Sequence, residues 1–397
     1  MRSRSAVRTT LAGLVTGVLV AALAPAATAA DVTTPFKVGI ITCKSGALAD
    51  YGDAYLDGWA AGLKFATKAG KVGKRKVEVL SIVDDKTGDI AGATAAFKDL
   101  VGKGAKIIAG TCSSATALAL APLAAQNKVI YMPGPAASDL LTGVNRYTFR
   151  TGRQTEQDVV TSLSFLSNKA GESVITMAED YAFGQGNATA MAYYAPSNVK
   201  VLDPVLVPLT TKDMTTYAKR VKDSKATVTY VAFSALNPWI ALAQQGVVQT
   251  SQIVTGLANR ETWDLVGSIG GADFSFLSHY FAGAGKTAAE KSMLAYLAGV
   301  NKDPDLFNPD GFNAAMMVAR AAAADKTGKD NVNTIIKSLE GYSFVSVKGK
   351  TTVRASDHAL IQPMFQAKLV KGSNGKFTPQ LIKTVQNVAP EFVEMKK

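Results

Sequence analysis

Short runs of β-branched residues alternate with amphipathic stretches along almost the whole chain after residue 35. A strand is expected at residues 37–42 and another at 77–83, and between them Leu56, Trp59 and Leu63 recur at helical spacing. Parallel strands need a crossover connection, which is usually an amphipathic helix. The alternation therefore constrains the chain to the α/β class.

The pattern restarts in the second third of the chain, which predicts two lobes of the same kind. No Gly-, Pro- or Ser-rich linker separates them, which favours several short hinge strands over a flexible tether. The last third is too short for a third domain and is expected to complete both lobes. Further strands are expected at 106–110, 129–132, 173–177, 201–207, 227–233 and 252–255, β-rich segments near 345–354 and 364–370, and helices at 93–101, 115–126, 155–167, 184–194, 214–221, 238–245, 287–298, 311–325 and 331–339.

The first thirty residues are typical of a secretory signal peptide. Three arginines fall within the first eight residues, an apolar stretch follows at 11–23, and small residues end at Ala29 and Ala30. The apolar stretch is shorter than the ~20 residues that span a bilayer. We expect export to the periplasmic or extracellular face of the envelope, with cleavage near Ala29 or Ala30. Neither cysteine lies near this point, so lipid attachment there is not expected.

Charge and size narrow the class of protein. The net charge of +12 is spread in ones and twos, and no basic run is interleaved with aromatic residues, so nucleic acid is not an expected partner. The chain of 397 residues, 47% of them hydrophobic, has enough apolar material for about two cores.

The sequence contains no recognisable catalytic or metal-binding constellation. His279 and His358 are far apart and neither has ligand spacing, so structural roles are expected for both. Asp84, Asp85 and Asp89 lack the spacing of a calcium loop and are expected to cap local turns. A G-x-S-x-G nucleophile motif is also absent. We therefore expect a protein that is not an enzyme and uses no cofactor and no metal.

The two cysteines follow two strands that a doubly wound sheet places side by side. Cys43 lies just after the first expected strand and Cys112 just after the third, and these strands are neighbours in a 2-1-3 order. In an oxidising compartment the two thiols can form a disulfide at the sheet edge. Two separate buried thiols are the alternative.

Residues 110–116 place hydroxyl groups where a strand ends and a helix begins. Free backbone N–H groups and the positive end of the helix dipole suit a carboxylate at such a point. Simple capping of the helix by Ser113 or Ser114 is the alternative. The turn at 133–139 repeats the arrangement after the next strand, and two such turns side by side favour a binding site.

Five segments in order resemble the leucine/isoleucine/valine-binding protein family of ABC importers. The resemblance implies a type I periplasmic binding protein fold, with two doubly wound parallel-sheet lobes joined by a three-strand hinge. The lobes are expected at 31–148 plus 279–358 and at 149–278 plus 359–397, after a signal peptide at 1–30. The segments are Ser45-Gly46 to Tyr51-Gly52-Asp53, Asp84-Asp85, Cys112-Ser113-Ser114, Pro135-Ala136-Ala137-Ser138 and Asp180-Tyr181-Ala182-Phe183-Gly184-Gln185-Gly186.

The same resemblance implies a ligand site built from both lobes. Tyr51 corresponds to an aromatic cover, and Ser113 with Ser114 to the hydroxyl-rich helix start that receives a carboxylate. Ala136 and Ser138 fall where a backbone carbonyl and a polar side chain reach the ligand. Phe183, Ser234 and Ala258 are expected in the wall of the second lobe.

One departure from the family pattern bears on the ligand. Amino-acid binders of the family place a carboxylate at the segment where this chain has Ala258, and an unpaired ammonium is costly to bury. A ligand without an amine, such as an aromatic acid, therefore becomes credible, with Arg153 or Arg260 as its cationic partner. Both arginines can equally be surface charges, and Glu261 can still reach an ammonium.

These features predict an extracytoplasmic solute receptor that closes around a small amino acid or organic carboxylate. Its expected protein partners are an ABC permease and ATPase, and its membrane contact is expected only through that transporter. A ligand-sensing module that feeds a signalling receptor is the alternative from another class.

Overall fold

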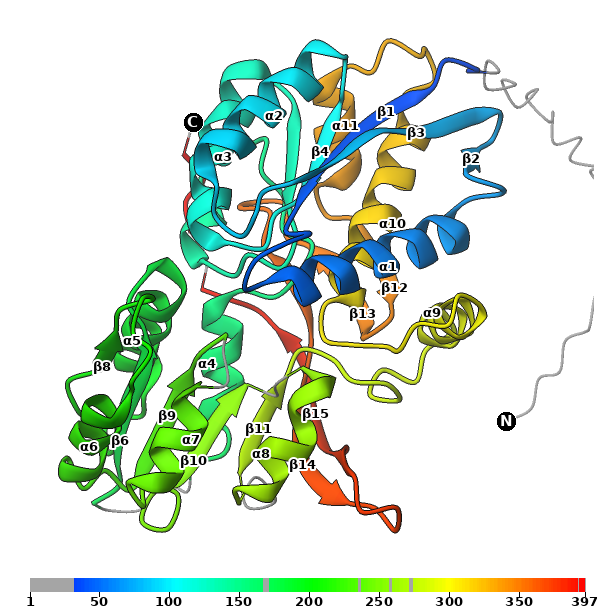
Figure 1. Ribbon diagram of the computed structural model, residues 1–397. Coiled ribbons are helices and arrows are strands. Elements are labelled where there is room, and N and C mark those ends of the chain that lie inside the picture. Colours follow the sequence, from blue (N-terminus) through cyan, green and yellow to red (C-terminus); the bar gives the residue numbers. More distant parts are fainter. Residues whose placement is uncertain are drawn as a thin grey trace, which may run out of the picture. The chain divides into compact units, whose positions relative to one another are not determined.

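The computed structural model describes residues 32–166, 171–234, 237–256, 259–270, 274–391 and 393–396. One compact unit extends from Asp31 to Lys397. Within it, two sheets and the helices that cover them form two α/β lobes (Figure 1). Of the helices in these ranges, none is long and apolar enough to cross a membrane.

The first lobe is built on a five-stranded sheet in the order β2-β3-β1-β4-β5. β1 pairs in parallel with both β3 and β4, so the strand order predicted around β1 is confirmed. Only the short β2 runs antiparallel to its neighbour β3. The strands are β1 (Phe36–Thr42), β2 (Lys71–Val72), β3 (Arg75–Asp84), β4 (Ile107–Gly110) and β5 (Ile130–Pro133).

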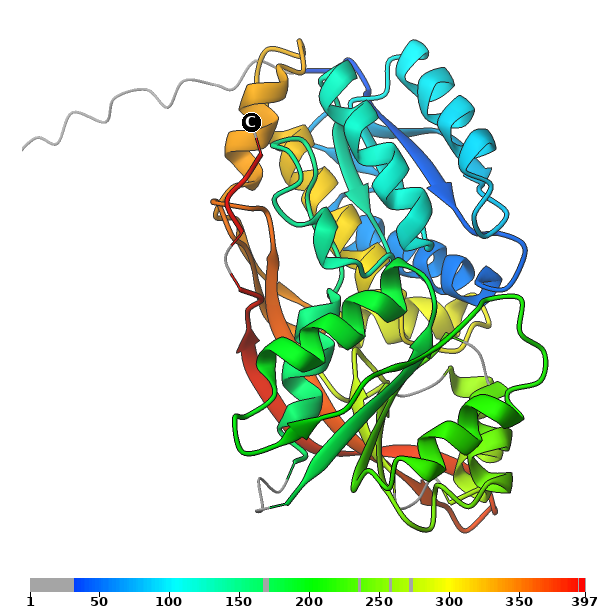
Figure 2. The same ribbon diagram turned by 90° about the vertical axis from the view of Figure 1, so that its left-hand side faces the viewer.

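Helices cover both faces of this sheet, as the period of two in its strands requires. Ile40 packs in a cluster with α1 (Ala49–Ala66), α10 (Asn308–Ala324) and α11 (Val332–Leu339). Ile41, the next residue, packs in another cluster with α2 (Ile90–Gly102) and α3 (Ser114–Asn127). Figures 1 and 2 show α1 and α10 side by side, although more than 240 positions separate them in sequence. α9 (Ala288–Gly299) packs beside α1.

Glycines allow α1 and α10 to approach each other closely. A Cβ atom on Gly58 would lie 1.9 Å from the carbonyl oxygen of Asn308, and one on Gly311 would lie 1.9 Å from that of Tyr55. Both distances are far below van der Waals contact, so a larger residue at either position would separate the helices. The N-terminal end of α10, which neighbours the site, is thereby fixed against the first turns of α1.

The second sheet has ten strands, eight of them on its main path and two, β8 and β15, paired off that path. Its central strands β6, β9, β10 and β11 are parallel, whereas β14 runs antiparallel to β11. The strands are β6 (Ser173–Glu179), β7 (Lys200–Val201), β8 (Val205–Val207), β9 (Val228–Ala232), β10 (Gln252–Gly256), β11 (Ser275–Ser278), β12 (Ser343–Ser346), β13 (Gly349–Val353), β14 (Leu360–Lys371) and β15 (Phe377–Val388), and the helices are α4 (Thr155–Leu163), α5 (Ala182–Tyr194), α6 (Thr215–Asp223), α7 (Asn237–Gln244) and α8 (Trp263–Ser268).

The chain passes between the lobes three times in its course from β5 to β14. It leaves the first lobe between β5 and α4, returns between β11 and α9, and leaves again between β13 and β14. The side chains of Phe344 and Val353 in the β12–β13 hairpin pack in the core of the first lobe, while β13 pairs with β14. The residue boundaries predicted for the two lobes stay a prediction.

Several local predictions differ from the structure. The strand expected at 201–207 is divided into β7 and β8, because Pro204 offers no N–H to a ladder. The β-rich segment near 345–354 is a hairpin, and the helix expected at 155–167 ends at Leu163. β11, β15 and α8 were not expected, since their sequences lack a clear period of apolar residues.

A buried ion pair in the first lobe links β3 to the segment before α11, and its contribution to stability can be tested. Arg75 in β3 pairs with Asp330, which precedes α11, and the Arg75 side chain is 2% exposed. Arg75→Met should lower the free energy of unfolding in urea by about 3 kcal/mol, because Asp330 is left buried without a counter-ion. The double variant with Asp330→Leu should recover most of that loss. Lys103→Ala, which breaks the exposed Lys103–Asp99 pair, should change stability by less than about 0.5 kcal/mol. If Arg75→Met and Lys103→Ala lowered the free energy of unfolding equally, this account would be wrong.

Candidate functional site

A cavity that is partly open to solvent lies where the carboxyl ends of strands from both sheets meet. Loops and helix starts after β1, β4 and β5 line it from the first lobe, and residues that end or follow β6, β9, β10 and β11 line it from the second. This is the position at which open α/β sheets bind ligands. The lining residues are Leu48, Tyr51, Cys112, Ser114, Pro135, Ala137, Arg153, Asp158, Tyr181, Phe183, Tyr230, Val231, Ala232, Phe233, Ser234, Trp239, Gly256, Asn259, Thr262, Leu277, His279, Leu306 and Phe307.

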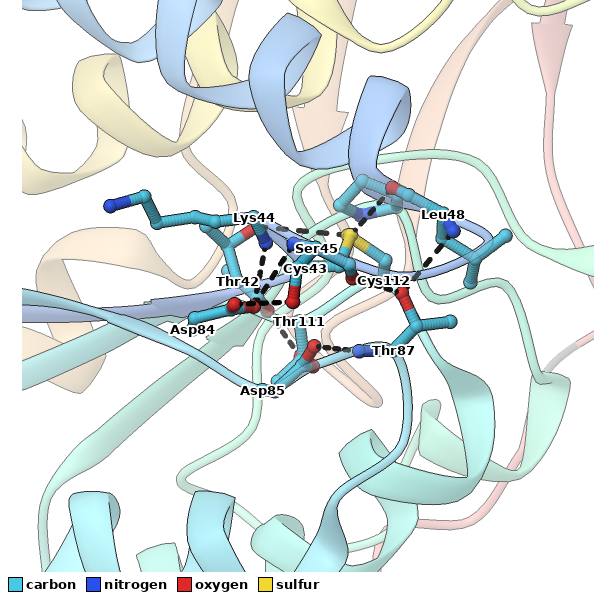
Figure 3. Close-up of a disulfide and its surroundings, with 12 residues drawn as sticks. Thr42, Cys43, Lys44, Ser45, Leu48, Asp84, Asp85, Thr87, Thr111 and Cys112 are labelled. Carbon is cyan, nitrogen blue, oxygen red and sulfur yellow. Dashed lines mark hydrogen bonds between the residues drawn. A yellow bond between two sulfur atoms is a disulfide. The ribbon is translucent and has the colours of Figure 1, made fainter.

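A disulfide between Cys43 and Cys112 fixes two first-lobe loops against each other (Figure 3). Their Cα atoms are 6.0 Å apart, and Leu48 and Tyr51 pack against the bridge. The bond therefore joins the loop that leads into α1 to the loop that leads into α3. Tyr51 in the first turn of α1 and Ser114 at the start of α3 take their positions from these two loops.

The carboxylate of Asp84 accepts hydrogen bonds from the loop after β1 and from the turn that follows β3 (Figure 3). Its Oδ1 accepts hydrogen bonds from the backbone N–H groups of Lys44 (2.8 Å), Ser45 (3.2 Å) and Lys86 (2.9 Å). Slight burial raises the pKa of Asp84, but these bonds and the Ser45 hydroxyl outweigh it and hold the pKa below its usual value. Asp89 caps α2 by accepting from Gly92 N–H, as predicted. Within the described ranges no three His, Cys, Asp or Glu side chains are grouped to hold a metal.

Two serines at the start of α3 serve different contacts. Ser113 is the N-cap residue, and its hydroxyl accepts from Thr116 N–H at 3.5 Å. Ser114 lines the cavity, and its hydroxyl accepts from Ser138 N–H at 3.2 Å. The turns at 110–116 and 133–139 thus lie side by side, as expected from the order of β4 and β5.

Arg150 holds the second of these turns from behind. Its guanidinium donates to the carbonyl oxygens of Ser138 (3.0 Å), Ala136 (3.0 Å) and Arg153 (2.8 Å). The side chain is fully buried, and burial lowers the pKa of Arg150 to about 10, so it remains charged at neutral pH. The carbonyl oxygens of Ala136 and Ser138 are therefore already engaged by protein donors.

Arg153 is the buried cation of the cavity wall. It is 5% exposed, and its Nη1 donates to the carbonyl oxygen of Pro135 at 3.0 Å. Its Nε lies 2.9 Å from His279 Nε2 and 3.1 Å from Asp158 Oδ2. Its guanidinium carbon lies 5.7 Å and 5.5 Å from the ring centroids of Phe183 and Phe307, within the range of cation–π attraction.

The second lobe meets Tyr51 across the cavity. The Tyr51 hydroxyl donates to the carbonyl oxygen of Ser234 at 3.4 Å, and its ring lies 4.3 Å from that of Phe307. The Ser234 hydroxyl donates to Glu179, whose two oxygens are 2.7 and 2.9 Å away. Burial raises the pKa of Glu179, and the Ser234 contact opposes that rise. Seven aromatic side chains line the cavity: Tyr51, Tyr181, Phe183, Tyr230, Phe233, Trp239 and Phe307.

The residues expected in the site fall into three groups. Tyr51, Ser114, Phe183 and Ser234 line the one cavity. Ser113, Ala136 and Ser138 each adjoin a lining residue, but they are absent from the set that forms the wall in the described structure. Ala258 lies outside the described residues.

The two candidate arginines are separated by the structure. Arg153 is buried in the wall, whereas the Arg260 side chain is 43% exposed and pairs with Asp303 at 2.7 Å. Sequence reasoning missed Asp158, His279 and Phe307, because their relation to Arg153 depends on contacts between distant segments.

Known protein sequences align with nearly the whole chain. A sequence profile for a periplasmic binding protein matches residues 35–376. A Leu/Ile/Val-binding protein of Rhizobium johnstonii is 27% identical over 349 residues, which cover 85% of this chain and 91% of the relative. A Leu/Ile/Val-binding protein homolog of Brucella suis is 24% identical over 385 residues, which cover 94% of this chain and 96% of the relative.

Solved structures share the fold. A solute-binding protein of an ABC transporter from R. palustris, solved with 4-hydroxybenzoate, superposes with a TM-score of 0.81 at 21% identity and covers 89% of this chain and 98% of its own. An ABC-type branched-chain amino acid transporter protein of Rhodopseudomonas palustris gives a TM-score of 0.75 at 27% identity and covers 91% and 100%. The two-lobed type I fold predicted from the sequence is confirmed. The chain belongs to the periplasmic binding protein family and is an exported solute-binding protein of the ABC-transporter class, not an enzyme.

Proposed function

We propose that this protein captures a small carboxylate with an apolar or aromatic body and delivers it to an ABC permease and its ATPase. The single observation that carries this proposal is the buried Arg153 in a cavity walled by aromatic rings. A charged guanidinium is unfavourable in such surroundings unless an anion completes its environment. In this proposal the ligand carboxylate supplies part of that environment.

The charges around the cavity floor favour an anion. Arg150 and Arg153 supply two positive charges close together. Burial raises the pKa of Asp158, but the charge of Arg153 opposes that rise and the pKa lies below its usual value, so this carboxylate is ionised and offsets one charge. Burial raises the pKa of Asp139 to about 7, so it offsets less of the Arg150 charge than an exposed carboxylate would. The two buried guanidinium groups therefore favour a negatively charged ligand group.

The start of α3 supplies a second group for the same carboxylate. In our proposal Ser113 and Ser114 present the helix N-terminus to the ligand, where the dipole favours a negative charge. Ala136 and Ser138 support this wall from the neighbouring turn through Arg150. Tyr51 and Phe183 then enclose the apolar part of the ligand from opposite lobes.

The aromatic wall favours a ligand with a ring. Burial of one aromatic side chain is worth about 1.5–3 kcal/mol, and offset or edge contacts between rings add to this. Proteins of the same fold have been solved with 4-hydroxybenzoate, 3,4-dihydroxybenzoate and benzoate. These ligands combine one carboxylate with one ring, which suits a cavity with a buried cation and an aromatic wall.

A branched-chain amino acid is the second candidate ligand. Asp158 Oδ1 has no hydrogen-bond donor within the described residues, and its carboxylate lines the cavity. An ammonium group would satisfy this oxygen while the ligand carboxylate contacts Arg153. The names of the Rhizobium and Brucella relatives support this candidate.

Export and closure complete the proposal. The mature protein begins after a signal peptide that is cleaved near Ala29 or Ala30. The lobes, with boundaries at residues 31–148 plus 279–358 and 149–278 plus 359–397, close around the ligand about the three crossings. A ligand shifts the balance toward the closed form only if it binds that form better, and a cavity lined from both lobes provides this difference.

Ligand class can be tested by thermal unfolding of the purified mature protein. We expect benzoate or 4-hydroxybenzoate, at roughly 1,000 times its Kd, to stabilise the native state by about 4 kcal/mol and raise Tm by at least ~5 °C. Leucine and valine should have a smaller effect because they add an ammonium near Arg153. Stabilisation by leucine alone would replace the first candidate with the second.

The role of Arg153 can be separated from that of positive charge in general. Arg153→Met should weaken benzoate binding by about 10- to 100-fold, since a hydrogen bond to a charged group is worth about 1.5–3 kcal/mol. Arg260→Met removes the same charge from an exposed position and should leave affinity within about 2-fold. Calorimetric titration measures both. Equal losses of affinity in Arg153→Met and Arg260→Met would show that Arg153 attracts the ligand only through long-range electrostatics.

The two serines of α3 should respond differently to truncation. Ser113→Ala removes the N-cap and should lower the free energy of unfolding by about 1 kcal/mol. Ser114→Ala should lower ligand affinity more than Ser113→Ala does, because Ser114 lines the cavity. Urea unfolding and ligand titration of both variants provide the comparison. Unchanged affinity in both variants would refute the helix start as a carboxylate site.

A further inference from the structure

His279 was expected to have a purely structural role, yet it lines the cavity beside Arg153. We propose that His279, as a neutral imidazole with its proton on Nδ1, is the positioning residue that orients Arg153 toward the ligand anion. The inference rests on the proposed function, in which Arg153 receives the ligand carboxylate. It adds a specific residue and a specific protonation form to that function.

The hydrogen bond between Arg153 and His279 determines the tautomer. A guanidinium is always protonated in proteins, so its Nε–H is the donor. The acceptor is His279 Nε2, 2.9 Å away, which must therefore carry no proton. Burial, followed by the charge of Arg153, lowers the pKa of His279 to about 4, so the ring is neutral at pH 7. The proton of the neutral ring then resides on Nδ1, which is buried and has no hydrogen-bond partner among the described residues.

Asp158 does not determine the orientation of the imidazole in this arrangement. Its Oδ1 lies 3.3 Å from His279 Nε2 and has no hydrogen-bond donor within the described structure. Its Oδ2 lies 3.1 Å from Arg153 Nε. The Nε–H group of Arg153 thus donates to His279, while the adjacent Asp158 carboxylate pairs with the charge of the guanidinium.

Two hydrogen-bond acceptors and one ion-pair partner together orient the guanidinium. His279 and Asp158 hold Nε, and the Pro135 carbonyl oxygen holds Nη1 at 3.0 Å. Among the described residues, no hydrogen-bond acceptor contacts Arg153 Nη2. In this proposal Nη2 donates to the ligand. The ring of Phe307 lies 5.5 Å from both the Arg153 guanidinium carbon and the His279 ring centroid, so it restricts both groups. Removal of one acceptor would free the guanidinium to rotate away from the ligand.

The two residues belong to different hinge segments. Arg153 lies between β5 and α4, where the chain first leaves the first lobe, and His279 follows β11, where it returns. Their contact therefore joins two crossings next to the ligand. The ionisable groups that act on His279 are Arg153 and Asp158 from the first crossing and α4, and Lys348 from the β12–β13 turn.

Two substitutions of similar size test the acceptor role. His279→Gln keeps an acceptor oxygen, whereas His279→Leu removes it. With benzoate and 4-hydroxybenzoate as probes, titration should show about 10-fold weaker binding for His279→Leu, the effect of one hydrogen bond to a charged group. His279→Gln should recover affinity to within about 3-fold of the unchanged protein. Equal affinities in both variants would overturn the proposal.

The same titrations distinguish failure of this inference from failure of the proposed function. If Arg153→Met weakens binding but His279→Leu does not, Arg153 binds the ligand without help from His279. If the unchanged protein binds neither probe, the proposed ligand class is wrong. Thermal unfolding of each variant shows that it is folded before its affinity is compared.

Nitrogen-15 NMR of the imidazole rings tests the tautomer without any ligand. The chain contains only two histidines, so His358→Gln assigns the spectrum. At pH 7 we expect His279 to show a protonated Nδ1 and an unprotonated Nε2, and Arg153→Met to shift the Nε2 resonance by removing its donor. A protonated Nε2 in the unchanged protein would overturn the proposal, because it could not accept from Arg153.

Discussion

The positive charge of Arg153 is the constraint on which the site depends. A guanidinium at 5% exposure needs acceptors for its N–H groups, since an unpaired buried charge is strongly unfavourable. The protein supplies them from three separate parts of the chain: the Pro135 carbonyl after β5, Asp158 in α4, and His279 after β11. These parts are adjacent only when both lobes and the crossings between them are formed. The ligand site is therefore a product of the whole fold rather than of one loop.

In the first lobe, several contacts hold the loops that form the cavity wall in place. Arg150 engages the carbonyl oxygens of the turn at 133–139, which prevents that turn from moving toward the cavity. The disulfide between Cys43 and Cys112 joins the loops after β1 and β4, and Asp84 accepts hydrogen bonds from backbone N–H groups of the loop after β1 and of its own turn after β3. Rigid loops of this kind reduce the entropy lost when a ligand binds. The side of the cavity that carries the helix starts is thus formed before the lobes close.

Sequence periodicity was sufficient for the parts of this architecture that depend on local patterns. The β-branched run of β1 and the helical spacing in α1 predicted the first sheet, and the order of its strands brought the two cysteines together. Ser114 followed from its place where a strand ends and a helix begins, whereas Tyr51 followed from the family resemblance. Local patterns could not reveal that His279 contacts Arg153, because 126 positions separate them and an isolated histidine carries no spacing signal. β15 was missed because its residues are mostly half-exposed and lack a clear apolar alternation.

The two lobes supply different contacts to the ligand, and this difference determines how the ligand drives closure. The helix starts are fixed within the first lobe, whereas Arg153 lies in a crossing and Ser234, which contacts Tyr51, follows a strand of the second lobe. A ligand carboxylate held only by the α3 start would bind open and closed forms almost equally, and so would not shift their balance. Contacts to Arg153 and to the second-lobe aromatic wall are complete only when the lobes meet. Those contacts therefore supply the difference in binding free energy that closes the protein, and the orientation of Arg153 by His279 acts directly on that difference.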